Sequence, residues 1–427
     1  MTVAAAAEAE AALRRRERQR RREAALFSLR EVMDAAAGRP PAEVAADEAP
    51  WRAVRDAFDV DRTIINLNNG GVSPSPRLVQ EALALDQRRS NEAPAYSMWA
   101  VLEPEKESVR AGLAALFGCE AEEVAITRNA CESLETCLFG FDLRPGDEVL
   151  TSNQEYPRTL AALRQRERRD GIVVRAVPLP VPAASSAELL DRFRRALTPR
   201  TRVLLVSHMT YLTGQILPVA EICRMGREAG VVVVVDGAHT LGHLPLRRED
   251  LGCDYFGATL HKWMMAPHGT GFLYVRRDKI ERLWPLMAPP ADMRPDDIRK
   301  FEQIGTHPAA PHNAIAEALE FHHALGAARK SARLRYLRDR WARPLSCHPR
   351  VRLLTNLEAS MSCGLGTFAV EGVEPAALAE ALWDRKRILV VAFAHEEFAG
   401  VRVTPSLYTT AGEVDTFVAE TLSILGG

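Results

Sequence analysis

Short runs of apolar residues, separated by amphipathic segments, recur along most of the chain. The clearest run is Val231–Val235, five valines in succession, and Arg202–Ser207 is similar in length and character. Such runs are typical of strands buried on both faces of a parallel sheet. Segments such as Glu103–Phe117 place apolar residues three and four positions apart, which predicts helices between the strands. Alternating strands and helices of this kind predict an α/β fold.

The pattern changes along the chain and predicts four segments. Toward the C-terminus, short strands at Arg352–Leu354, Gly366–Val370 and Ile388–Ala392 surround a helix at Pro375–Asp384, which predicts a small α+β domain. The predicted segments are a helical, Arg-rich extension and linker (1–50), a segment associated with the small domain (51–75), a large domain (76–325) and the small C-terminal domain (326–427).

Composition excludes several classes of protein. The 427 residues carry 55 Lys plus Arg against 56 Asp plus Glu, so no overall field draws the chain to nucleic acid or to a membrane. No stretch of about 18 apolar residues predicts a transmembrane helix. Seven cysteines without a CxxC pair indicate a reducing compartment, no disulfide framework and no metal site, so we expect a cytoplasmic protein.

The first 50 residues are unusual because Arg14–Glu23 contains seven arginines. An export signal would need an apolar segment next, but Ala24–Ala37 carries charges and predicts a helix. A nucleic-acid-binding arm is an alternative, although glutamates interrupt the arginines and no aromatic residues lie among them. We therefore expect a solvated helical extension that packs on a partner subunit, followed by a linker at Gly38–Pro50.

The chemistry of the chain concentrates just after the valine run. Asp236 and His239 follow that strand, and Thr259, His261 and Lys262 follow the next apolar segment. Ligands bind at the carboxyl edge of parallel strands. A lysine in apolar surroundings loses its charge more readily and can form a Schiff base with a carbonyl, while a buried aspartate can pair with a protonated heterocyclic nitrogen. Pyridoxal phosphate (PLP) requires both groups from its protein.

With these residues in this order, the sequence resembles the class V aminotransferase family from about Leu67 to the C-terminus. Within that family it is similar to the branch that contains isopenicillin N epimerases and cysteine desulfurases. The resemblance implies the fold type I of PLP enzymes, with a mostly parallel seven-stranded sheet flanked by helices and a small α+β domain. It also implies that Asp236 pairs with the ring nitrogen, His239 contacts the ring hydroxyl, Thr259 and His261 bind the phosphate, and Lys262 forms the internal aldimine.

Further cofactor contacts follow from the same resemblance. The turn before the helix at Ala130 and Cys131 occupies the phosphate-binding place, but it lacks the hydroxyl groups usual in the family, so backbone N–H groups must serve. Tyr156 stands where an aromatic ring stacks on the cofactor. Thr306 stands in a Gly-Thr turn that reaches the cofactor phosphate of a neighbouring subunit, which implies a homodimer.

The substrate contacts implied by the resemblance are Arg402, Asn69, Gly70 and Tyr211. An arginine suits two-point binding of an α-carboxylate. Asn69 and Gly70 lie in the N-terminal turn at the mouth of the site. Tyr211 replaces the asparagine common in the family and can donate a proton, so the activity of relatives does not transfer directly.

Several reactions remain open at this point. We expect a small amino-acid substrate and a reaction at its α-carbon, by epimerisation, C–S lysis or transamination, which leaves transferase, isomerase and lyase unresolved. Val391–Val401 contains no cysteine, which argues against a cysteine desulfurase. The alternatives are an oxidase or decarboxylase on the same scaffold, or a non-catalytic or nucleic-acid-associated protein that uses the Arg-rich N-terminus.

Overall fold

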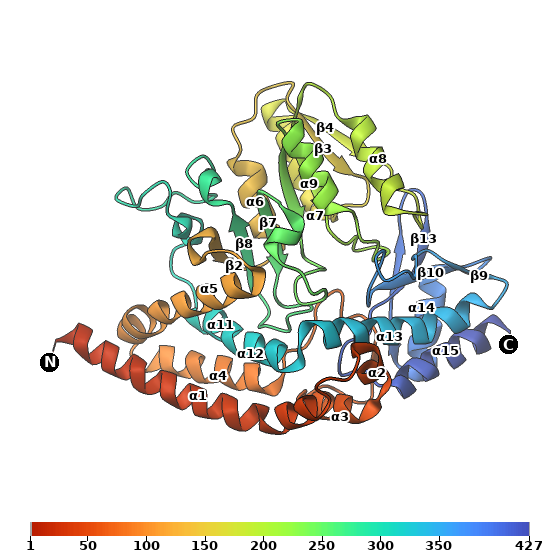
Figure 1. Ribbon diagram of the computed structural model, residues 1–427, viewed down its shortest axis with the longest axis horizontal. Coiled ribbons are helices and arrows are strands. Elements are labelled where there is room, and N and C mark those ends of the chain that lie inside the picture. The colour runs from red at the N-terminus through yellow and green to blue at the C-terminus, as the bar shows by residue number, and fades with distance from the viewer. Residues whose placement is uncertain (1, 427) are drawn as a thin grey trace.

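The computed structural model describes residues 2–426, and its centre is a seven-stranded sheet (Figure 1). β8 pairs antiparallel with both of its neighbours, β2 and β7, and the other pairings are parallel. In spatial order the strands are β2 (Val124–Thr127), β8 (Gly271–Val275), β7 (Tyr255–Thr259), β6 (Val232–Asp236), β5 (Thr201–Ser207), β3 (Glu148–Ser152) and β4 (Val173–Val177). The predicted fold class and its mostly parallel sheet are confirmed.

Helices cover both faces of this sheet because successive side chains of its central strands point to opposite sides. Val233 and Val235 join an apolar core on one face, and Val234 joins a second core on the other. The valine run is therefore buried on both faces, as predicted. The helices of this part of the chain are α4 (Arg77–Glu92), α5 (Glu103–Phe117), α6 (Ala130–Gly140), α7 (Pro157–Asp170), α8 (Ser186–Ala196), α9 (Val219–Glu228), α10 (Arg248–Leu251), α11 (Ala309–Asn313) and α12 (Ile315–Leu325), with a π-helix at Tyr96–Leu102.

The C-terminal part, blue in Figure 1, forms a four-stranded antiparallel sheet with helices packed against it. Trp341, Phe368 and Phe417 meet in its apolar core. Its elements are α13 (Ala327–Ser346), β9 (Val351–Leu353), β10 (Gly366–Val370), α14 (Pro375–Lys386), β11 (Ile388–Leu389), β12 (Val391–Ala394), β13 (Ala399–Val403) and α15 (Ala411–Leu425). β11 pairs instead with β1 (Ile65–Asn66), which brings the N-terminal turn beside this small domain.

The N-terminal helix α1 (Val3–Ala35) lies along one side of the molecule, next to α4 and α12 (Figure 1). Arg14 donates to Asp86 at 2.8 Å, and both Arg18 and Arg22 bind Glu317, at 2.5 Å and 2.8 Å. Residues four apart share one face of a helix. The expectation of a solvated extension is therefore wrong for this face, which binds the chain's own carboxylates. The exposed arginines of the run are Arg15, Arg16, Arg20 and Arg21.

The predicted linker, Gly38–Pro50, is instead largely helical: it contains α2 (Pro41–Ala46) and the start of α3 (Glu48–Asp56). Trp51 is buried, and its Nε1 donates to the backbone oxygen of Val44 at 2.8 Å. Proline is favourable in the first turn of a helix, so a Pro- and Ala-rich composition did not exclude helices. Within residues 2–426, no helix combines the length and the apolar character needed to cross a bilayer.

Candidate active site

Three neighbouring strands end at one edge of a deep cavity. β5 ends at Ser207 and β6 at Asp236, which are aligned in register, and Asp236 is in turn aligned with Gly257 near the end of β7. The cavity at this edge has a volume of about 610 Å³. The predicted residues that line it are Gly70, Ala130, Cys131, Tyr156, Tyr211, Asp236, His239, Thr259, His261, Lys262 and Arg402.

Asp236 is a buried carboxylate that accepts few hydrogen bonds from the protein. Its Oδ1 accepts a hydrogen bond from the backbone N–H of Ala238 at 2.8 Å, and its Oδ2 accepts none from residues 2–426. Burial raises the pKa of the Asp236 carboxyl above its ordinary value, and the bond from Ala238 and the charge of Lys262 oppose this shift. A cationic group bound in the cavity would therefore stabilise the ionised form of Asp236.

Lys262 follows β7 on a short loop, and it lines the cavity. Burial lowers the pKa of its amine to about 8, although the negative charge of Asp236 opposes this shift. The backbone N–H of Met265 donates to the oxygen of Lys262 at 3.2 Å, and the N–H of Ser73 donates to that of His261 at 3.0 Å. The loop is thus held on both sides of Lys262, and a substantial fraction of the amine is neutral near physiological pH.

His239 lies against this amine. The Nε2 atom of His239 is 3.1 Å from Nζ of Lys262, and the indole Nε1 of Trp263 donates to its Nδ1 at 3.3 Å. Burial lowers the pKa of His239 well below its ordinary value, and the charges of Lys262 and Arg402 lower it further. The imidazole is therefore neutral at physiological pH.

The N-terminus of α6 forms another part of the cavity wall. Asn129 caps this helix, with its Oδ1 accepting from the N–H of Glu132 at 2.9 Å, and Ala130 and Cys131 line the cavity. The first N–H groups of a helix have no partner within it and attract anions. Burial raises the pKa of the Cys131 thiol, so this side chain stays protonated. The arrangement suits a phosphate bound by backbone groups.

Thr259 and His261 add polar groups to the same cavity. The hydroxyl of Thr259 lies 2.9 Å from Nε2 of the His261 ring. Burial lowers the pKa of His261 to about 4, so the ring is neutral and carries one N–H donor. Nδ1 of this ring lies 3.2 Å from the backbone oxygen of Thr270, which can only accept, so Thr259 and His261 present neutral polar groups to the cavity without adding charge.

Two tyrosines face each other in the cavity wall. The rings of Tyr156 and Tyr211 are perpendicular, with centroids 5.5 Å apart. Burial raises the pKa of the Tyr211 hydroxyl, with a smaller opposing effect from the charge of Arg402, so the hydroxyl stays protonated at neutral pH. Tyr156 is 37% exposed and offers a ring to a planar ligand.

Arg402 reaches the cavity from β13 of the small domain. Its Nη1 donates to the backbone oxygen of Tyr211 at 2.9 Å, and its Nη2 donates to Oδ1 of Asn68 at 3.2 Å. Its Nε has no hydrogen-bond partner within residues 2–426, and no carboxylate among them forms an ion pair with it. Burial lowers the pKa of this guanidinium to about 10. A buried cation with no counter-ion in the protein suits an anionic ligand.

Asn69 does not line the cavity, so the predicted substrate contact is wrong for this residue. Its side chain is 1% exposed; Nδ2 donates to the backbone oxygen of Thr404 at 3.1 Å, and Oδ1 accepts from the hydroxyl of Tyr408 at 2.6 Å. Asn69 therefore holds the turn in place. Its neighbour Asn68 makes the polar contact to Arg402 instead.

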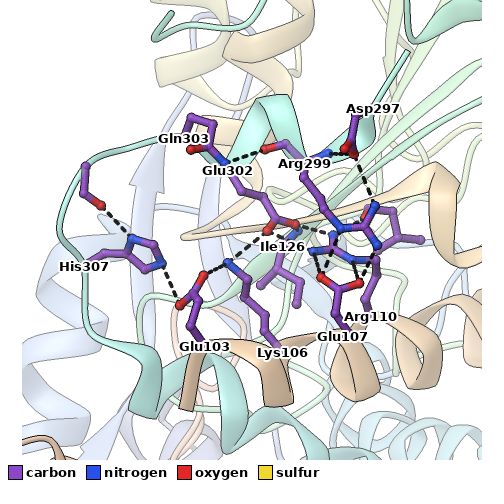
Figure 2. Close-up of polar contacts among 12 residues, drawn as sticks. Glu103, Lys106, Glu107, Arg110, Ile126, Asp297, Arg299, Glu302, Gln303 and His307 are labelled. Carbon is purple, nitrogen blue, oxygen red and sulfur yellow. Dashed lines mark hydrogen bonds and ion pairs between the residues drawn. The ribbon is translucent and has the colours of Figure 1, made fainter. Parts of the chain in front are cut away.

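Thr306 lies outside the main cavity and lines a separate one of about 310 Å³, together with Trp99 and Lys106. Figure 2 shows how the preceding segment is anchored: Glu302 accepts from Nη2 of Arg110 at 3.0 Å and lies 3.1 Å from the Lys106 amine. The contact of Thr306 with a partner subunit's cofactor therefore stays a prediction.

The sequence did not predict several polar residues at or near the site. Glu155 accepts from the hydroxyls of Ser152 at 2.7 Å and Ser207 at 2.5 Å, behind the edge that carries Asp236. Burial raises the pKa of the Glu155 carboxyl to about 7. The serines at the ends of β3 and β5 were a usable signal, because both strands end at the same sheet edge. Other cavity residues that were missed are Arg158, Thr159, Met209 and Val391.

These groups fit pyridoxal phosphate. Asp236 has an oxygen without a partner for a protonated ring nitrogen, Lys262 provides an amine with a lowered pKa, and the N-terminus of α6 provides a phosphate site. The polar residues of the cavity thus satisfy the requirements of the cofactor at three separate places.

Comparison with known proteins supports the same assignment. The sequence model of a family described as Aminotransferase class-V matches residues 65–417. Isopenicillin N epimerase of Streptomyces clavuligerus is 30% identical over 395 residues, which cover 89% of this chain and 99% of that protein. Isopenicillin N epimerase of Amycolatopsis lactamdurans is 31% identical over 393 residues, which cover 88% and 98%.

Among solved structures, the chain is similar to C-DES, a cystine C–S lyase. A C-DES variant with glycine covalently linked to its PLP cofactor matches with a TM-score of 0.77 and 26% sequence identity, covering 86% of this chain and 98% of that one. The similarity therefore extends over both the large and the small domain.

Proposed function

This chain belongs to the class V aminotransferase family of PLP-dependent enzymes, and we propose that it epimerises an amino-acid substrate at the α-carbon. The observation that carries the proposal is that two groups able to exchange a proton, Lys262 and Tyr211, line one cavity with Arg402. The two relatives that match over nearly their full length are isopenicillin N epimerases, which supports the same reaction.

The cofactor is pyridoxal 5′-phosphate, and the geometry of the cavity supports a set of residues that would bind it. Asp236 would pair with the ring nitrogen, Tyr156 would contact the ring face, and the N-terminus of α6 with Thr259 and His261 would hold the phosphate. Bound PLP acts as an electron sink that weakens the bonds at the α-carbon of an attached amino acid. An ionised Asp236 would keep the ring nitrogen protonated, on which that electron sink depends.

Arg402 is the proposed anchor for the substrate carboxylate. It is fixed by Tyr211 and Asn68 but has no carboxylate partner of its own within residues 2–426. A carboxylate bound there would complete the coordination of a buried cation, which is worth more than a neutral hydrogen bond. Anchoring the carboxylate positions the α-carbon near both Lys262 and Tyr211.

Epimerisation requires one group to take the α-proton and another to return a proton to the opposite face. Lys262 suits the first role because the lowered pKa of its amine leaves part of it neutral. Tyr211 suits the role of proton donor because the raised pKa of its hydroxyl keeps the hydroxyl protonated at neutral pH. Removing Tyr211 should leave proton loss intact and abolish inversion.

A cysteine desulfurase is the less favoured reaction. It needs a nucleophilic cysteine, and the segment from Val391 to Val401 has none. Cys131 lines the cavity, but burial raises the pKa of its thiol, whereas nucleophilic cysteines have lowered pKa values.

The homodimer also belongs to the proposal. Trp99, which is 62% exposed, lines the second cavity together with Thr306. A partner subunit on this face would cover the tryptophan and bring Thr306 to the partner's cofactor. Sedimentation of the wild type against Trp99→Glu tests the interface: a dimer that the substitution dissociates is expected.

The test of the reaction is incubation of the PLP-loaded protein with a panel of amino acids in D₂O. Chiral chromatography detects inversion, mass spectrometry detects α-deuterium, and separate assays detect sulfide and α-keto acids. Inversion with α-deuterium incorporation is expected for the wild type, and incorporation without inversion for Tyr211→Phe. Sulfide or keto acid formation without inversion would instead establish C–S lysis or transamination.

A further inference from the structure

The two ring nitrogens of His239 have different partners, and this identifies the nitrogen that carries the proton. The indole Nε1 of Trp263 lies 3.3 Å from Nδ1 of His239, and an indole N–H can only donate. Nδ1 must therefore be the acceptor. A neutral imidazole carries one proton, so that proton is on Nε2, which lies 3.1 Å from Nζ of Lys262.

Trp263 is itself held firmly. Its ring is 1% exposed and stacks on His243, with centroids 3.7 Å apart and planes 20° apart. Nδ1 of His243 donates to the backbone oxygen of His239 at 2.8 Å, and Nε2 of His243 accepts from the N–H of Gly364 at 2.8 Å. The amine of Lys330 donates to the backbone oxygen of Trp263. The indole N–H is thereby aimed at His239.

We propose that Trp263 is a positioning residue that fixes the tautomer of His239, so that Nε2–H faces the cavity as a donor to the Lys262 amine and the cofactor. The inference about the tautomer concerns this chain alone, while its consequence for the cofactor rests on the proposed function.

The tautomer matters because it selects the charge state of the neighbouring amine. An Nε2–H group facing Lys262 can donate to the lone pair of a neutral amine. An ammonium group has only N–H donors, so at 3.1 Å it would face another donor, and this arrangement disfavours the charged form of Lys262. The opposite tautomer would present a lone pair on Nε2, accept from the ammonium and stabilise it. Trp263 thus favours the neutral, nucleophilic amine through His239.

The first test reads the tautomer directly by ¹⁵N-histidine labelling of the full-length chain, prepared with and without PLP. Long-range ¹H–¹⁵N correlation distinguishes protonated from bare ring nitrogens, and the spectrum of His239→Gln identifies the His239 signals. His239 is expected to carry its proton on Nε2 and His243 on Nδ1, which provides an internal reference. In Trp263→Phe the His239 pattern should shift toward Nδ1–H while the His243 pattern persists.

The second test measures the pH dependence of PLP capture by the cofactor-free chain. Trp263→Phe should raise the midpoint by about one pH unit and slow capture at pH 7 roughly tenfold. The matched control is Trp341→Phe, because Trp341 is also buried but its Nε1 has no partner within residues 2–426. This control should leave the midpoint unchanged.

The His239→Gln background separates a positioning role from a packing role. Glutamine has no tautomers, so adding Trp263→Phe to His239→Gln should not shift the midpoint further. An unchanged His239 spectrum in Trp263→Phe, or an equal shift in the glutamine background, would overturn the proposal. A chain that fails to bind PLP would contradict the proposed function. The inference about the tautomer is tested independently, by the His239 spectrum of the chain without PLP.

Discussion

Arg402 of the small domain and Asn68 of the N-terminal turn meet at the cavity, where Nη2 donates to Oδ1 at 3.2 Å. The contact orients the guanidinium without neutralising it, because an amide oxygen carries no formal charge. The two residues lie far apart in the sequence, and the adjacent bridge between Asn68 and Thr404 brings their segments together. The cavity thus contains an oriented cation whose charge remains available to a ligand.

Substitution of Arg402 should therefore weaken substrate binding more than cofactor binding. Arg402→Ala removes a charge-assisted interaction worth about 2 to 3 kcal/mol, which corresponds to a 30- to 150-fold increase in KM, to order of magnitude. Arg402→Lys keeps the charge but loses the two-point geometry, so an intermediate effect is expected. Steady-state kinetics provide the measurement, and the exposed Arg352→Ala on β9 is the control. An unchanged KM in Arg402→Ala would exclude the anchoring role.

The pH dependence of cofactor capture should report the Lys262 amine. Only the neutral amine attacks an aldehyde, so the rate rises with pH and levels off above the pKa of about 8. Between pH 7 and pH 9 the rate should rise roughly tenfold, whereas an unperturbed lysine would titrate near about pH 10.4. Stopped-flow absorption after mixing with PLP measures this rate. The exposed Lys386→Met should keep the wild-type profile, and Lys262→Met should form no borohydride-reducible product.

The parts of the site that the sequence predicted lie within short segments. Asp236 and His239 follow one strand, and Thr259, His261 and Lys262 follow the next strand of the sheet, so local sequence order already places them at one edge. The valine run is buried on both sides for the same reason: its composition leaves no polar face to expose. Local pattern was therefore sufficient to bring these residues to one edge of the sheet.

The missed parts depend on contacts between distant segments. Asn69 is held away from the cavity by Thr404 and Tyr408, more than 300 residues away, and the sequence of the turn does not contain that information. The same holds for the arginines of α1, whose carboxylate partners come from three separate helices. An arginine run has the same composition whether it faces water or buried carboxylates.

Glu155 should make stability depend on pH in a specific direction. Burial raises the pKa of its carboxyl from 4.5 to about 7, so the folded state binds the proton more tightly than the unfolded state. This contribution is fully present below the unfolded pKa and is lost as pH rises through about 7, a change on the order of 3 kcal/mol. Glu155→Gln should lack that loss, so the variant gains stability relative to the wild type between pH 5 and pH 8.

Urea unfolding at both pH values measures the difference for Glu155. Glu92→Gln, at an exposed position of α4, is the matched control and should follow the wild type. Equal pH dependence in the wild type and Glu155→Gln would show that this carboxyl titrates in its ordinary range.

The arginines of α1 should stabilise the fold and not bind nucleic acid. Arg18 is bound to Glu317, whose side chain is 1% exposed, and lies 3.4 Å from Asp86 and 3.5 Å from Glu105. Arg18→Met removes the charge while keeping an apolar side chain of similar length, and it leaves three buried carboxylates with weaker compensation. Unfolding free energy should fall by about 2 to 3 kcal/mol, because Arg14 and Arg22 retain part of the pairing.

The matched control for Arg18 lies on the opposite face of the same helix. Arg20 is exposed, so Arg20→Met should change the unfolding free energy by less than about 0.5 kcal/mol. Urea denaturation compares both variants with the wild type, and a filter-binding assay with duplex DNA across salt concentrations tests the alternative. If Arg20→Met weakened salt-dependent DNA binding while Arg18→Met left stability unchanged, the arginine run would be a nucleic-acid arm. If only Arg18→Met destabilises the protein, α1 is held to α4, α5 and α12 by buried ion pairs.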